Sequence, residues 1–119
     1  MIQIFGSSKS FDCKAAQRFF KERRTAFQFI DLKEKTMSRG EFNSVIDALA
    51  KDYGSRLEAL EAMVDKKSKK YSEFEYLDDS EKEEKIFDNQ LELLLLPVCR
   101  NGKISASFGV KQNIWEKWL

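Results

Sequence analysis

The first thirty residues constrain the fold most strongly, because two short apolar segments flank one stretch of helical periodicity. The first apolar segment covers residues 2–5 and ends at Gly6, and the second covers residues 27–30. Between them, alanine and phenylalanine side chains recur at helical spacing over residues 15–20. A strand–helix–strand unit of this length favours a parallel crossover.

The loop between the first strand and the helix carries the candidate chemistry. Ser10 is a good helix N-cap, and Cys13 follows in the first helical turn, where free N–H groups and the helix dipole favour a thiolate. Lys9 adds a positive charge nearby, whereas Asp12 opposes reactivity because a neighbouring carboxylate raises a thiol pKa. Cys13 is therefore either a reactive thiol or a small core residue. Ser10 has no base to activate it, which favours the capping role.

Composition narrows the classes of function. The chain has 119 residues, which suits one domain. Its 21 basic and 20 acidic residues balance, so we expect no direct nucleic-acid contact, and no apolar run is long enough for a membrane span. Histidine is absent, which removes Cys–His catalysis and argues against a metal site. We expect a cytoplasmic monomer whose two cysteines stay reduced.

The middle of the chain is predicted to be helical. Serine–glutamate capping-box patterns predict two helices that begin after Ser38 and Ser55. Residues 65–74 lose this periodicity and are predicted to form a loop, whose lysines form a solvated charged cluster. A further helix is predicted over residues 78–94.

The last quarter changes period. Residues 96–100 and 103–108 are predicted as two strands joined by a two-residue type I′ turn at Asn101-Gly102. Pro97, the only proline, lies at an edge, a bulge or a cis bend. A final amphipathic helix is predicted over residues 114–119, with its tryptophans packed in the core.

This order of elements resembles a thioredoxin-type core, which is an α/β fold with a four-stranded mixed sheet. Here a helical insertion over residues 36–93 would separate its two halves. The chain is similar to the arsenate reductase (ArsC/Spx) family of glutaredoxin-like proteins over nearly its whole length, residues 1–119, as one domain. Three segments carry the resemblance: IQIFGSSKSFDCKAA, DKKSKKYSEF and LPVCRNGKI.

The resemblance implies a thiol-dependent oxidoreductase that acts on a thiol substrate, with no bound cofactor and with glutathione as a possible electron donor. It assigns Cys13 and Ser10 to the catalytic loop, and Lys9 and Pro97 to the substrate side. Pro97 would correspond to the cis-proline that faces this loop. Many family members have their nucleophilic cysteine where this chain has Ser10, so the loop is a degenerate Ser-x-x-Cys.

Two arginines that the family uses are also missing. Leu96 replaces the arginine before the proline, and the other would fall near Ala62, about two turns from Arg56. Arsenate-like oxyanions are held by fork-shaped guanidinium donors. The alternative hypothesis is therefore a non-catalytic member that binds a protein partner. Spx-like members bind RNA polymerase, which makes that enzyme a candidate partner by analogy only.

Cys99 lies two residues after Pro97 and is expected on the same strand face, pointing toward Cys13. A disulfide needs Cα atoms within ~7 Å of each other. Two free buried thiols are the state we expect in a reducing compartment.

Overall fold

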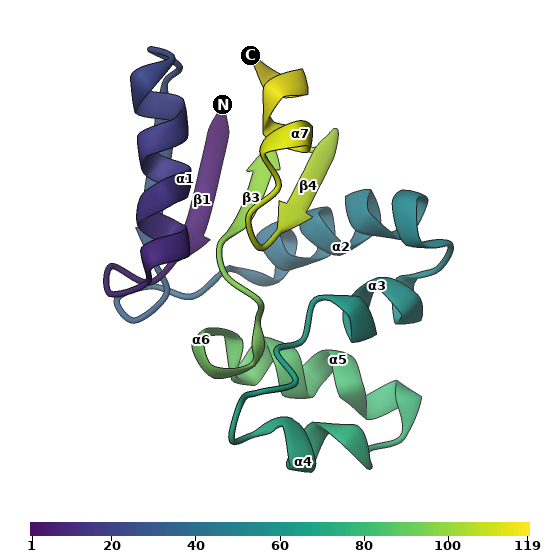
Figure 1. Ribbon diagram of the computed structural model, residues 1–119. Coiled ribbons are helices and arrows are strands. Elements are labelled where there is room, and N and C mark those ends of the chain that lie inside the picture. Colours follow the sequence, from purple (N-terminus) through teal and green to yellow (C-terminus); the bar gives the residue numbers. More distant parts are fainter.

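The computed structural model describes residues 1–119, with the chain starting as strand, helix and strand. Figure 1 shows the elements in order. The strands are β1 (Ile2–Gly6), β2 (Phe27–Asp31), β3 (Val98–Asn101) and β4 (Ser105–Phe108). The helices are α1 (Phe11–Glu22), α2 (Arg39–Tyr53), α3 (Arg56–Ala62), α4 (Tyr71–Glu75), α5 (Asp79–Asp88), α6 (Gln90–Leu93), α7 (Gln112–Trp115) and the 3₁₀ helix η1 (Glu116–Trp118).

The four strands form one mixed sheet in the order β2-β1-β3-β4, as the sequence predicts. Strand β1 runs parallel to β2, with Ile4 opposite Phe29, and antiparallel to β3, with Ile4 opposite Cys99. The hairpin β3–β4 thus joins the amino-terminal unit through β1. This arrangement confirms the predicted α/β fold with a four-stranded mixed sheet.

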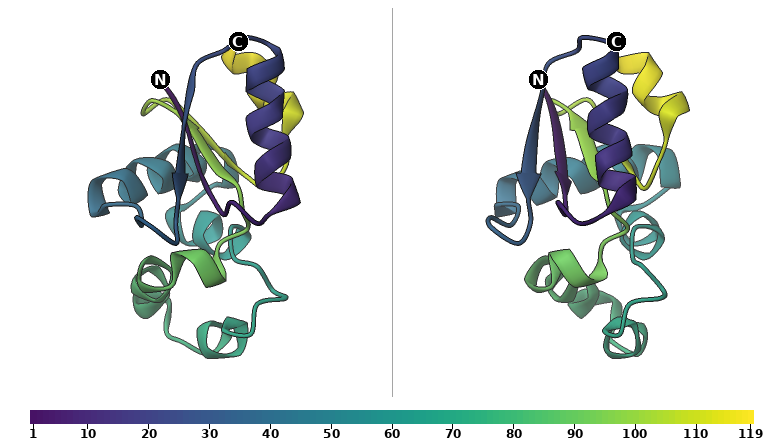
Figure 2. Two further views of the ribbon diagram at one scale, coloured as in Figure 1. Left: turned by 90° about the vertical axis from the view of Figure 1, so that its left-hand side faces the viewer. Right: turned by 60° about the vertical axis from the view of Figure 1, so that its left-hand side comes forward.

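Helices cover both faces of the sheet. Figure 2 shows α1 and the C-terminal helices on one face and α2 on the other. Side chains alternate between the two faces of β1, so Ile4 joins a core with Phe20 and Trp115, whereas Phe5 joins the larger core with Phe42. Trp115 is fully buried, which confirms the predicted packing of that tryptophan.

Helices α3–α6 lie below the sheet in Figure 1 and, like α2, fall between β2 and β3 in the chain. Buried Gln90 in α6 ties them to the segment between β2 and α2. Its amide oxygen accepts from Met37 N–H (2.7 Å), and its nitrogen donates to the Met37 carbonyl (3.1 Å). None of the helices combines the length and apolar character that a membrane crossing needs.

The predicted helix starts are confirmed by their hydrogen bonds. The hydroxyl of Ser38 accepts from Glu41 N–H (3.1 Å), and the Glu41 carboxylate accepts from Ser38 N–H (2.8 Å), which completes the capping box. Ser55 caps α3 through Glu58 N–H (3.1 Å). Helix α2 ends at Gly54, whose φ of 97° lies in the left-handed region that glycine tolerates.

Two predictions for the middle of the chain are wrong. The predicted loop at residues 65–74 contains the start of α4, because burial of Phe74 in the larger core stabilises a short helix without strong sequence periodicity. The predicted helix over residues 78–94 is divided at Asn89 (φ −134°, ψ 45°). The Asn89 side chain donates to the Lys85 carbonyl (2.9 Å), which satisfies an acceptor at the end of α5.

The predicted two-residue turn is also wrong. Residues 102–104 form the turn, and Asn101 remains in β3, paired with Ser105 on one side and Ile2 on the other. Only Gly102 has a positive φ (57°) there, whereas a type I′ turn needs two such residues. Pairing on both sides holds Asn101 extended, because β3 is an inner strand of the sheet.

Candidate functional site

The loop between β1 and α1 is closed by its own hydrogen bonds. Ser10 N–H donates to the Ser7 carbonyl (3.2 Å), and Lys9 N–H donates to the Ser7 hydroxyl (3.2 Å). The Ser10 hydroxyl accepts from Cys13 N–H (3.2 Å) as the N-cap of α1. The hydroxyl therefore satisfies one of the free N–H groups at the helix start, which is the capping role predicted from the sequence.

Cys13 lies under this loop with no exposed surface. Its sulfur accepts a hydrogen bond from Ser7 N–H (3.4 Å). A Cβ atom on Gly6 would lie 2.4 Å from that sulfur, so the close approach of strand and thiol requires glycine at position 6. Solvent and other proteins cannot reach the thiol in this structure.

Cys99 is the second buried cysteine, and both thiols are free. Burial raises the pKa of the Cys99 thiol far above its usual value, the charge of Cys13 raises it further, and a hydrogen bond with Ser107 lowers it in part. The effect of Cys13 on the Cys99 pKa agrees with their positions, since Cys99 pairs with Ile4 of β1, two residues before Gly6. Cys99 is therefore a neutral thiol at physiological pH.

Pro97 follows a cis peptide bond from Leu96, which confirms the conformation that the family resemblance implies. It is buried, and its carbonyl accepts from Gly109 N–H (3.0 Å). Phe5 pairs with Val98, so continuing the register places Pro97 across from Gly6, the residue above the Cys13 sulfur. The structure thus brings Pro97 to the inner side of the loop that holds Cys13.

Lys9 lies apart from these residues, on the outer side of the loop. It lines a cavity of about 370 Å³. The other lining residues are Ser7, Ser8, Asp31, Lys33, Glu34 and Leu91. Neither Cys13, Ser10 nor Pro97 lines this cavity, and no arginine does. The structure therefore does not join the four predicted site residues in one cavity. The cavity beside Lys9 carries side chains of both charges, which makes it a poor match for an oxyanion.

Arg56, the arginine closest in sequence to the expected oxyanion-binding position, is already occupied. Its guanidinium donates to Glu83 (2.8 Å), Asp47 (2.6 Å) and Asn43 (2.7 Å). The hydrogen bond with Glu83 is the main cause of a raised Arg56 pKa, and the same bond lowers the pKa of Glu83. These contacts join α2, α3 and α5, so Arg56 has a structural role here.

Sequence reasoning gave no role to Phe11, which is the most exposed large apolar residue of the chain at 86 %. It is the first residue of α1, directly after the Ser10 cap, and the Lys14 ammonium lies 5.7 Å from its ring centre. The available signal was an aromatic residue on the otherwise polar face of this helix. The loop therefore presents an apolar and basic surface and keeps its thiol inside.

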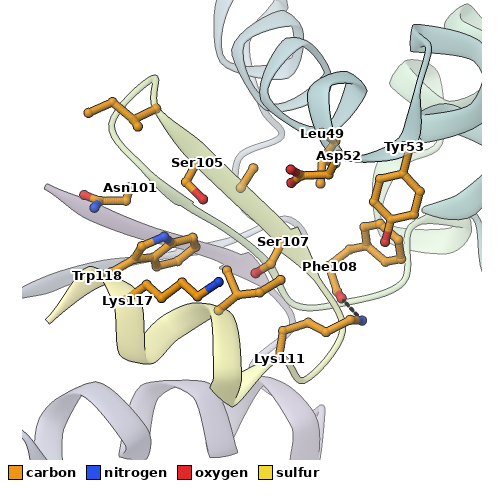
Figure 3. Close-up of a pocket in the computed structure, with 13 residues that line it drawn as sticks. Leu49, Asp52, Tyr53, Asn101, Ser105, Ser107, Phe108, Lys111, Lys117 and Trp118 are labelled. Atoms are coloured by element: carbon orange, nitrogen blue, oxygen red, sulfur yellow. Dashed lines mark hydrogen bonds between the residues drawn. The ribbon is translucent and has the colours of Figure 1, made fainter.

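A second feature missed by sequence reasoning is a cavity of about 610 Å³ along β4 (Figure 3). Helix α2 contributes Leu49, Asp52 and Tyr53 to one side, and the C-terminal segment contributes Lys117 and Trp118 to the other. No sequence pattern indicates this cavity, because three separate segments form it only after the chain has folded.

No metal-binding cluster of at least three cysteine, aspartate or glutamate side chains is found in the chain. No protein-family model and no curated protein matches the sequence. Solved structures do match the fold. An arsenate reductase from Vibrio cholerae superposes with a TM-score of 0.78 at 18 % identity, covering 99 % of this chain and 97 % of that one.

Two further structures give the same result. A protein from Staphylococcus aureus COL matches with a TM-score of 0.73 at 21 % identity, covering 98 % of this chain and 97 % of that one. An arsenate reductase (ArsC) related protein from Brucella melitensis matches with a TM-score of 0.59 at 13 % identity, covering 98 % and 92 %. The chain therefore has the fold of ArsC-type arsenate reductases over nearly its whole length.

Proposed function

We propose that this chain is an ArsC/Spx-type protein that has lost surface thiol chemistry and works by binding another protein through its β1–α1 loop. The observation that carries the proposal is the contrast within that loop. Its cysteine is fully buried under Gly6, while Phe11 beside it is almost fully exposed. A thiol that attacks a disulfide or an oxyanion must be reached by its substrate.

Several other residues support this proposal. The position where family members carry a nucleophile holds Ser10, which caps α1. Arg56 is held by Glu83 and its neighbours and is not free to bind an oxyanion. An exposed aromatic ring with a lysine, Lys14, beside it is the kind of surface that supplies binding energy at protein interfaces.

Thiol accessibility tests the loss of chemistry. We expect both cysteines of the native chain to react with Ellman's reagent at least about a hundredfold more slowly than in urea, because reaction must await local opening. The Ser10→Cys variant is the matched control, since it places a thiol at the partly exposed cap and should react rapidly. A native Cys13 that reacts as fast as this control would contradict the proposal.

Binding is tested separately with purified RNA polymerase, the partner suggested by the family resemblance. We expect Phe11→Ser to weaken the complex by about tenfold or more, and Tyr76→Ser, which removes another exposed aromatic residue far along the chain, to leave it unchanged. Failure of RNA polymerase to bind at all would exclude this partner. Equal binding by Phe11→Ser would exclude the loop as the contact surface.

A second candidate function is thiol-dependent reduction with glutathione as electron donor. The Ser7 N–H bond to the Cys13 sulfur favours it, because that bond fixes the sulfur within the loop that the family resemblance assigns to catalysis. Turnover of arsenate in a glutathione/glutaredoxin-coupled assay, lost in Cys13→Ala, would support this function. Activity gained only by Ser10→Cys would instead show an intact scaffold without its nucleophile.

A further inference from the structure

Strand β4 forms a free edge of the sheet, since only β3 lies beside it. Gly109 N–H donates to the Pro97 carbonyl, and Cys99 pairs with Ser107 in the same ladder. Because hydrogen bonds alternate in an antiparallel pair, the N–H and C=O groups of Ala106 and Phe108 point away from β3. The edge therefore offers backbone donors and acceptors to a further strand.

Lys111 protects one of these groups. Its ammonium donates to the Phe108 carbonyl (2.8 Å), as the dashed line in Figure 3 shows. A lysine at a sheet edge is a common guard against unwanted strand pairing. No protein group outside the β3–β4 ladder bonds to the backbone of Ala106, which lines the cavity. A strand added along β4 would therefore pair with Ala106 without displacing a protein contact.

The edge lies at the bottom of the 610 Å³ cavity, between two walls. Figure 3 shows the Leu49 and Tyr53 side chains from α2 on one side of β4 and Trp118 from the C-terminal segment on the other. Strand β4 has four residues, which span about 13 Å. The cavity therefore has the form of a short groove whose floor is the free edge of β4 and whose walls are partly apolar.

The charges of the groove differ between its walls. Lys111 and Lys117 both line the C-terminal side, and neither takes part in a salt bridge. Asp52 lies on the α2 side. Because successive side chains of a strand point to opposite faces, an added strand would direct every second side chain toward the lysines.

We propose that β4 binds an extended segment of another protein, in which acidic and apolar residues alternate, as a fifth strand. The segment's backbone would exchange hydrogen bonds with Ala106. Its acidic side chains would face Lys117, and its apolar side chains would pack on Leu49 and Tyr53. This proposal does not rest on the proposed function, because the β1–α1 loop contributes no residue to the groove.

The first test uses a capped octapeptide of alternating valine and glutamate as the probe. It is titrated into the full ¹⁵N-labelled chain and followed by NMR. We expect the largest shift changes at β4 and at the two walls. A peptide of alternating valine and lysine should bind about tenfold more weakly or worse, because its lysines would face Lys117 with like charge. Lys117→Glu should weaken the acidic peptide, and Lys33→Glu, a charge change elsewhere, should not.

The second test addresses the backbone bonds. Ala106→Pro removes the outward N–H of the edge while leaving the ladder to β3 intact, a position where strands tolerate proline. We expect this variant to lose at least about tenfold in affinity for the acidic peptide. Should the variant fail to fold, the same peptide with alternate backbone nitrogens methylated answers the question with the unaltered protein, and it should not bind.

Three results would overturn the proposal. Equal binding of the acidic and basic peptides would remove the charge argument, and equal binding of the N-methylated peptide would show that no strand is added. Absence of binding at millimolar peptide would show that the β4 edge accepts no added strand and that Lys111 only blocks it. A Phe11→Ser variant that binds the peptide normally would keep this groove distinct from the loop surface.

Discussion

Different forces stabilise the region around Cys13 and the region around Arg56, which lies about two turns from the position where the family resemblance expects an arginine. Cys13 is fully buried, with its sulfur packed against Gly6. The Arg56 side chain is 37 % exposed and held by charged partners such as Glu83. The first region therefore depends on steric fit and the second on charge. The loss in the free energy of unfolding should therefore depend on side-chain size in the first region, and on pH and salt in the second.

The largest effect is expected where steric fit dominates. Trp115→Ala removes a fully buried ring that packs near Phe19 and Phe20 and donates to the Ser107 hydroxyl (3.0 Å). We expect a loss of about 3–5 kcal/mol in the free energy of unfolding, measured by urea denaturation. The loss should be the same at low and high salt. A loss under about 1 kcal/mol would show that the α1 face of the sheet is loosely packed.

Gly6→Ala is expected to cost about 1–3 kcal/mol, because the new methyl group would lie 2.4 Å from the Cys13 sulfur. In a Cys13→Ala background the sulfur is absent, so the same change should cost much less. The coupling free energy of this double-mutant cycle measures the contact directly. Additive effects of the two substitutions would contradict the steric description of the loop.

The charged region should show its contribution through pH. The hydrogen bond from Arg56 holds the pKa of Glu83 below its ordinary value of 4.5 in the folded chain. The native state then binds fewer protons than the unfolded state near that pH, so this stabilisation is present above the unfolded pKa and is lost as the pH falls through the folded pKa. Stability should therefore decline on the acid side of this value.

The corresponding variant is Glu83→Gln. We expect it to lower the free energy of unfolding by about 1 kcal/mol at about pH 7, and by much less at an acid pH below the lowered folded pKa, where Glu83 is protonated in both states. Salt at about 1 M should reduce the difference at neutral pH. An equal loss at both pH values would mean that packing, and not charge, governs the contact with Arg56.

The smallest effect is expected at the Arg18–Glu22 pair on the outer face of α1. Both side chains are mostly exposed, and the charged atoms lie 3.7 Å apart. Glu22→Gln should change the free energy of unfolding by about 0.5 kcal/mol or less, because water screens exposed pairs. A larger change would indicate that charge also stabilises the α1 side of the molecule, which would weaken the contrast between the two regions.

Much of the fold could be predicted from local signals. The serine caps at positions 38 and 55 mark helix starts because a side-chain oxygen satisfies the free N–H groups of its own helix. Helix α4 and the break at Asn89 could not be predicted in this way. The burial of Phe74 and the start of a new helix at Gln90 both depend on contacts between segments that are distant in the sequence.

The candidate site likewise contains some residues whose position could be predicted from the sequence and others whose position could not. The sequence indicated that Ser10 caps α1, the family resemblance implied a cis bond before Pro97, and the structure confirms both. The sequence alone did not decide whether the Cys13 side chain is exposed. A residue in the first turn of a helix can face either the solvent or the sheet. The sequence also left undecided whether the Phe11 side chain, on the same turn, is exposed to solvent, as the structure shows it to be.

By itself, the sequence determined the helix caps and most of the order of elements, because periodicity and capping act over a few residues. The pairing of the hairpin with the first strand followed from the family resemblance. Only the tertiary structure decided the burial of Cys13, the partners of Arg56 and the groove along β4. Each depends on how closely separate segments approach one another, and that distance is set by packing of the whole core.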